Sequence, residues 1–107
     1  MRIIEIYTNC PSLQVAQDIS AYCIEKRYIA CSNILQSVIS SFHWNGKIEN
    51  ETECKLIMKT RHELFKSVES AVKNQHPYKI PCIIGTEIQY INDDYKKWVY
   101  SETKSLA

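Results

Sequence analysis

The chain has 107 residues, with thirteen Lys or Arg against twelve Asp or Glu and a formal net charge of +1. This length suits a single domain over residues 1–107, and the small charge provides no field to attract a nucleic acid or an anionic membrane. No stretch approaches the ~18 apolar residues of a membrane span, and the N-terminus has no apolar signal segment. We therefore expect a soluble cytoplasmic protein with neither a nucleic-acid nor a membrane partner.

The cysteines support the same location. There are five of them, an odd number, and no C-x-x-C pair occurs. This number and spacing argue against both a disulfide framework and a structural zinc site. Free thiols suit a reducing compartment.

The N-terminal part of the chain predicts a strand and a helix. Apolar alternation predicts a strand over residues 2–8, which a turn at residues 9–12 ends. A helix follows, with Ser12 as its N-cap. Its apolar face is formed by Ala16, Ile19, Cys23 and Ile24.

Residues 29–60 predict a long hairpin with arms of about 14 residues that turn at Asn45-Gly46. Asn-Gly is a strong signal here because a type I′ turn requires φ > 0 at both central residues. At ~3.3 Å per residue each arm extends roughly 45 Å, whereas helices of ~16 residues extend about 24 Å. Phe42 and Trp44 near the tip would then remain in water unless another chain covers them. We therefore expect an oligomer.

The second half predicts a helix, a strand and a final helix. Residues 60–63 match a capping box, in which the Thr60 hydroxyl and the Glu63 carboxylate satisfy two backbone N–H groups. Helical spacing of apolar residues continues to Val72, and His76-Pro77 ends this helix. A strand is expected over residues 82–90, and a short helix from residue 92.

The predicted order of elements is βαββαβ with a terminal helix. This order defines an α+β fold, the ferredoxin-like sandwich. Right-handed crossovers then place the first and third strands in the middle of the sheet. Because this fold carries many unrelated functions, the function has to be argued from the site.

Several activities lack the residues they need. Phosphate and nucleotide sites usually contain several glycines, and this chain has only Gly46 and Gly85. The loop at residues 9–12 has no Arg, which an acylphosphatase of this fold would use, and one Cys where a soft-metal chaperone would have two. No short Cys/His spacing indicates a nucleophile with its base. We expect no enzymatic activity.

Metal ligation remains, with His76, Cys31 and Cys82 as candidate ligands that suit copper or zinc. Each has a structural alternative. A strand cysteine such as Cys31 is commonly a small buried apolar residue, and His76 is equally a favourable cation at a helix C-terminus. The hairpin carboxylates could add ligands or pair with cross-strand lysines. They belong to Glu49, Glu51 and Glu53.

Five stretches of the sequence resemble the CutA family of divalent cation tolerance proteins. They are ACSNI at residues 30–34, SSFHWNGKIE at 40–49, KT at 59–60, HPYKIPCII at 76–84 and YKKW at 95–98. The resemblance extends over residues 3–99. It implies a cytoplasmic homotrimer of ferredoxin-like subunits, linked to tolerance of copper and other divalent cations and without established catalysis. Some members have a metal-binding Cys where this chain has Thr8.

The resemblance and the residues together predict a site in a cleft between subunits that binds Cu(II) or another divalent cation. The expected ligand-binding residues are Lys59, Tyr78, Trp44 and Glu49, and the expected metal ligands are His76, Cys31 and Cys82. The alternative is a trimeric small-molecule sensor resembling the PII signalling proteins. Such a sensor would need a flexible loop with glycine between the second and third strands, where this chain has a stiff hairpin.

Overall fold

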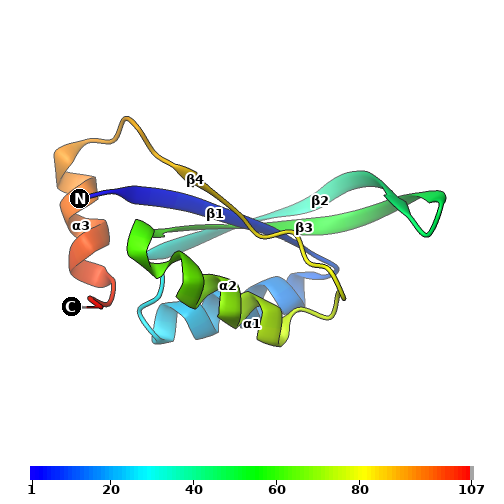
Figure 1. Cartoon of the computed structure of the whole chain (residues 1–107), viewed down its shortest axis with the longest axis horizontal. Coiled ribbons are helices and arrows are strands. Elements are labelled where there is room, and N and C mark those ends of the chain that lie inside the picture. Colours follow the sequence, from blue (N-terminus) through cyan, green and yellow to red (C-terminus); the bar gives the residue numbers. More distant parts are fainter. Residues whose placement is uncertain (107) are drawn as a thin grey trace.

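A computed structural model describes residues 1–106 as a four-stranded antiparallel sheet with two helices against one face (Figure 1). The elements are β1 (Ile3–Cys10), α1 (Leu13–Glu25), β2 (Cys31–Trp44), β3 (Lys47–Arg61), the 3-10 turn η1 (His62–Leu64), α2 (Phe65–Gln75), β4 (Ile84–Glu87) and α3 (Asp93–Glu102). The strand order β2-β3-β1-β4 has the first and third strands in the middle. The predicted α+β, ferredoxin-like class is confirmed.

The central pair of strands is β1 with β3. Every residue of β1 has a partner, from Ile3 opposite Arg61 to Cys10 opposite Cys54. Alternate side chains of both strands face α1 and α2, as the period of two in a pleated strand requires. The buried cluster contains Ile4, Ile6, Cys10, Cys54, Leu56 and Met58 from the sheet and Ala16, Ile19, Cys23, Val68, Ala71 and Val72 from the helices.

The helix α1 begins and ends where its capping residues place it. The Ser12 side chain accepts a hydrogen bond of 3.2 Å from the Val15 N–H, which confirms the predicted N-cap. After the C-cap at Lys26, Arg27 takes a left-handed conformation (φ 58°) that turns the chain toward β2. None of the helices within residues 1–106 combines the length and the apolar character needed to cross a membrane.

The strands β2 and β3 form the predicted hairpin, with 14 and 15 residues. Asn45 and Gly46 have φ values of 51° and 75°, so both central residues of the turn have the positive φ of a type I′ turn. The hairpin extends well past α1 and α2 and its tip projects from the molecule (Figure 1). On its projecting part Ile39 and Ile48 are 83% and 70% exposed.

A β-bulge interrupts β2 at the base of the projecting part. The pairing with β3 shifts between Leu35 and Val38, where β2 has one residue more than its partner strand. Ser37 lies within this shift and has φ of 61°. Bulges of this kind increase the local twist of a strand and redirect it.

The predicted capping box at Thr60 is wrong. Thr60 belongs to β3, and its hydroxyl donates a hydrogen bond of 2.6 Å to the Tyr28 carbonyl. The turn η1 begins after β3 and has no side-chain cap. The hydroxyl instead satisfies a carbonyl of the segment that leads into β2, a partner 32 residues away that no local pattern indicates.

β4 is shorter than the predicted strand over residues 82–90. Only Ile84–Glu87 are in β4, paired with residues 4–7 of β1. Within it, Gly85 lies against α2, where an added Cβ would come within 3.0 Å of the Phe65 ring. A larger residue here would therefore force the Phe65 ring to shift.

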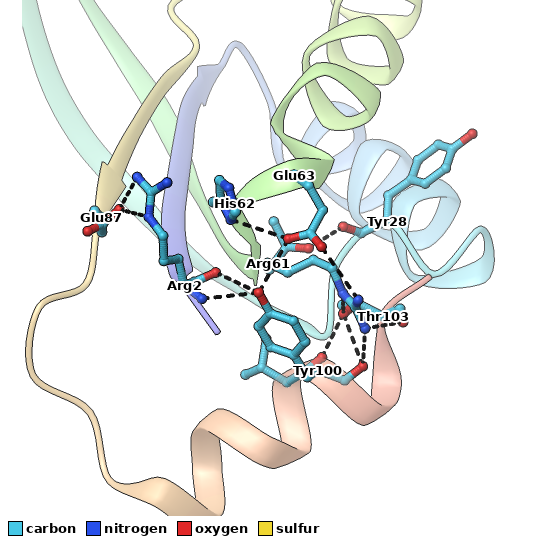
Figure 2. A network of polar contacts seen from close by, with 10 residues as sticks. Arg2, Tyr28, Arg61, His62, Glu63, Glu87, Tyr100 and Thr103 are labelled. Carbon is cyan, nitrogen blue, oxygen red and sulfur yellow. Dashed lines mark hydrogen bonds and ion pairs between the residues drawn. The ribbon is translucent and has the colours of Figure 1, made fainter. Parts of the chain in front are cut away.

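Arg61 fastens α3 to the end of β3 (Figure 2). Its buried guanidinium donates to the Thr103 hydroxyl (2.9 Å), to the Thr103 carbonyl (3.0 Å) and to the Tyr100 carbonyl. It also lies 4.2 Å from the centroid of the Tyr100 ring. The Tyr100 hydroxyl in turn accepts from the Arg2 N–H at 3.1 Å, so the same junction includes the start of β1.

Replacing Arg61 should loosen α3. We expect Arg61→Ala to lower the free energy of unfolding by about 3 kcal/mol, because it leaves buried carbonyls without donors. Arg27→Ala is the matched control, since Arg27 also bonds to α3, at Glu102, but with its side chain 62% exposed. Its cost should stay below about 1 kcal/mol. Urea unfolding of both variants measures the difference, and equal losses would contradict the role given to Arg61.

Candidate functional site

A cleft of about 990 Å³ lies where the hairpin leaves the body of the molecule. Its walls come from the end of β1, the projecting parts of β2 and β3, and the segment between α2 and β4. The lining residues are Asn9, Pro11, Ser40, Ser41, Phe42, Trp44, Glu49, Glu51, Glu53, Pro77, Tyr78, Lys79, Ile80 and Cys82. Four of the seven predicted site residues are among them: Trp44, Glu49, Tyr78 and Cys82.

Carboxylates dominate the charge of this cleft. Glu49, Glu51 and Glu53 occupy alternate positions of β3, so the pleat directs them to one side. Among the described residues that line the cleft, Lys79 is the one basic residue facing these three. The local balance of charge therefore favours a cation.

Glu53 is the innermost of the three carboxylates and is only 5% exposed. The Tyr78 hydroxyl donates a hydrogen bond of 2.6 Å to its Oε2. Burial, this hydrogen bond and the charges of Glu53 and Glu51 raise the pKa of Tyr78 well above its usual value. Tyr78 is therefore a neutral phenol that donates to the carboxylate.

His76 holds this tyrosine in place. It is the C-cap of α2, and its Nδ1 accepts the Tyr78 N–H at 3.2 Å. Nε2 must then carry the ring proton, which it donates to the Asn9 carbonyl at 2.7 Å. The rings of His76 and Tyr78 are also in contact, with centroids 4.6 Å apart and their planes tilted by 49°. His76 could bind a metal ion only by giving up one of these two hydrogen bonds.

Cys82 lies on the far wall of the cleft, beside β1. Its thiol is hydrogen-bonded to Tyr7, and the charge on Cys82, burial and this bond raise the pKa of the Tyr7 hydroxyl. The Lys55 ammonium lies over the Tyr7 ring, 4.1 Å from its centroid. Cys82 is therefore a partly buried thiol with a polar neighbour at the edge of the acidic cleft.

The other two predicted residues lie elsewhere. Cys31 and Lys59 are partners across β2 and β3, six residues along β3 from Glu53 and so roughly 20 Å away. The Cys31 thiol lies 3.1 Å from the Tyr95 hydroxyl, and this bond, with burial and the Cys31 charge, raises the pKa of Tyr95 to about 12. Lys59 lies 4.0 Å from Glu5 at a second hollow, which Tyr95 also lines.

The structure does not gather His76, Cys31 and Cys82 around one point. Within residues 1–106, no group of three or more His, Cys, Asp or Glu side chains is arranged to hold a metal ion. The residues that sequence reasoning missed are Glu53 as a buried carboxylate and Asn9 as the partner of His76. The alternation of glutamates on β3 signalled the first, whereas nothing in the sequence signalled a carbonyl 67 residues away.

Comparison with known proteins supports the resemblance found in the sequence. The family described as CutA1 divalent ion tolerance protein matches residues 4–102. The divalent-cation tolerance protein CutA of Pyrococcus horikoshii is 36% identical over 95% of this chain and 99% of its own length. Protein CutA of Mus musculus is 32% identical over 94% of this chain, which spans 57% of the mouse protein.

Solved structures agree with these matches. The periplasmic divalent cation tolerance protein CutA from Archaeoglobus fulgidus superposes with a TM-score of 0.93 at 37% identity, covering 95% of this chain and 99% of that one. CutA1 from Oryza sativa gives a TM-score of 0.94 at 29% identity, covering 97% of this chain and 95% of that one. Sequence and fold therefore agree over nearly the whole chain, and the protein belongs to the CutA1 divalent ion tolerance family.

Proposed function

We propose that this protein is a homotrimer that binds divalent cations, Cu(II) among them, without catalysing a reaction. The observation that carries the proposal is the acidic cleft at the base of the hairpin, where three glutamates and a thiol face a single lysine. The name that its relatives share, divalent-cation tolerance protein, supports a cation as the ligand.

The exposed hairpin supports the trimer. The part of the ribbon beyond the bulge has large apolar side chains on both faces, including Ile39, Ile48 and Trp44. A two-stranded ribbon is marginally stable by itself in water, and an apolar one invites pairing. Neighbouring copies related by a closed rotation axis would cover every hairpin without leaving an unpaired surface. Each cleft would then lie next to a second chain.

The arrangement of donors supports a site completed by a neighbour. A carboxylate as buried as Glu53, whose hydrogen-bond donor Tyr78 is uncharged, gains from a cation nearby. Carboxylates and a thiolate together make a borderline set that suits copper or zinc. Since one chain does not bring three such groups together within residues 1–106, we assign the remaining ligands to the adjacent copy.

The predicted site residues divide by role in this proposal. Glu49 and Cys82 are ligand candidates in the cleft, and Trp44 is its apolar wall. His76 positions Tyr78, which in turn orients Glu53. The five free cysteines support action in the cytoplasm, where thiols stay reduced.

We expect the wild-type protein at micromolar concentration to have the mass of three subunits by light scattering. Trp44→Ala should weaken association by about 3 kcal/mol per site, because the indole loses its cover between chains. Tyr22→Ala is the matched control: Tyr22 is a comparably exposed aromatic residue, but it lies on α1 rather than on the hairpin. A monomeric wild type would refute the trimer, and equal dissociation of both variants would refute the hairpin as its interface.

Calorimetric titration with Zn(II), and then with Cu(II), tests the cation site. Zinc comes first because it has no redox chemistry with thiols. Glu49→Gln and Cys82→Ser should each weaken binding by at least about 10-fold. The affinity should also fall as the pH is lowered, because protons compete with the cation for carboxylates and thiolates.

Cys31→Ser is the control for thiol chemistry, since Cys31 lies outside the cleft. Its affinity should match that of the wild type. Loss of binding in Cys31→Ser as large as in Cys82→Ser would mean that the cation binds free thiols wherever they occur. Native mass spectrometry with added nucleotides gives a further check, because binding of a nucleotide would favour a sensor resembling the PII proteins.

A further inference from the structure

Two buried thiols face each other across the central strands. Cys10, the last residue of β1, is the register partner of Cys54 in β3. Directly opposed residues of an antiparallel pair project from the same face. Both side chains therefore point toward the helices and not into the cleft, and they are 0% and 7% exposed.

The ladder fixes the spacing of this pair. The His62 N–H donates to the Arg2 carbonyl at 2.9 Å, so Arg2 and His62 are a hydrogen-bonded pair of the antiparallel ladder. Such pairs recur at every second residue, and four steps along β1 reach Cys10 and Cys54. Their Cα atoms are then about 5.5 Å apart, within the range of roughly 4.4–6.8 Å that disulfides span.

The side chains would have to approach a little further. Cβ atoms of opposed residues lie about 4.5–5.5 Å apart, against roughly 3.5–4.5 Å in a disulfide. Cys10 is the last paired residue of β1, so no ladder pair beyond it opposes this approach. A bond formed with this strain is the readily reduced kind.

The surroundings of Cys10 keep its thiol protonated. Burial, the neighbouring Cys54 and the Glu53 carboxylate together raise the pKa of the Cys10 thiol to about 11. Cys10 also contributes to the raised pKa of Tyr78, so the thiol faces groups on both β3 and the segment after α2. An anionic thiolate is disfavoured among them, so the attack by Cys10 is slower at neutral pH than that of an exposed thiol.

We propose that Cys10 and Cys54 form a reversible intramolecular disulfide on exchange with a small-molecule disulfide. The Cys54 thiol, the more exposed of the two, loses its proton and attacks the reagent, whose first thiol leaves and takes up a proton. The Cys10 thiol then loses its proton and attacks the Cys54 sulfur, and the second thiol of the reagent leaves with a proton. Two protein thiols are oxidised to one disulfide while one reagent disulfide is reduced to two thiols.

Formation of this disulfide would make the geometry of the cleft depend on the redox state of the protein. Asn9 and Pro11 flank Cys10, Glu53 precedes Cys54, and all three line the cleft. A disulfide would therefore hold the end of β1 against the base of the hairpin. The inference goes beyond cation binding and does not depend on it.

Oxidised glutathione is the probe, added to the full-length protein before thiol alkylation. We expect the intact mass to fall by two hydrogens and tryptic mapping to link residues 3–26 with residues 48–55. The first peptide also contains Cys23. Cys23→Ala is therefore the matched control: Cys23 is equally buried, and this variant should still form the link, whereas Cys10→Ala and Cys54→Ala should not.

A second readout does not depend on any variant. The Tm of the oxidised wild type should exceed that of the reduced protein, because the bond closes a long loop through α1 and β2, and dithiothreitol should reverse the change. A link through Cys23, a stable glutathione adduct without the internal bond, or five thiols that remain free would each overturn the proposal.

Discussion

The pairing of β1 with β3 is the interaction on which the rest of this molecule depends. It is the full-length ladder at the centre of the sheet, and its inner face supplies about half of the buried cluster under α1 and α2. The two ends of this strand pair contact different parts of the molecule. At one end Arg61 and the start of β1 hold α3, and at the other Cys10 and Cys54 lie behind the walls of the acidic cleft.

The cleft itself depends on a short series of hydrogen bonds whose donors are all uncharged. The Asn9 carbonyl fixes the tautomer of His76, His76 fixes the backbone of Tyr78, and the Tyr78 hydroxyl fixes the Glu53 carboxylate. None of these three hydrogen bonds is an ion pair. The negative charge of Glu53 is therefore oriented without being neutralised, which leaves it available to a cation.

The sequence predicted those features that repeat at short range. Alternation and Asn45-Gly46 predicted the hairpin, and the period of the apolar residues predicted α1 and α2. The right-handed crossover rule predicted the central position of β3. The capping box failed because the Thr60 hydroxyl found a partner across the fold. The candidate site was predicted in part: Trp44, Glu49, Tyr78 and Cys82 do share one cleft. Lys59 and Cys31 lie six residues along β3 from Glu53 and outside that cleft in one chain.

The bulge in β2 decides what the hairpin tip presents to each side. Past the shift, Phe42 stands opposite Glu49 and Val38 opposite Glu53, so even-numbered residues of β2 share a side with the glutamates. Before the bulge, the odd-numbered residue Leu35 lies on the face of the glutamates, opposite Lys55. Loss of one residue at the bulge would therefore move every side chain of β2 beyond it to the opposite face of the hairpin. A deletion that scarcely shortens the strand would turn the aromatic wall away from the carboxylates and bring His43 in its place.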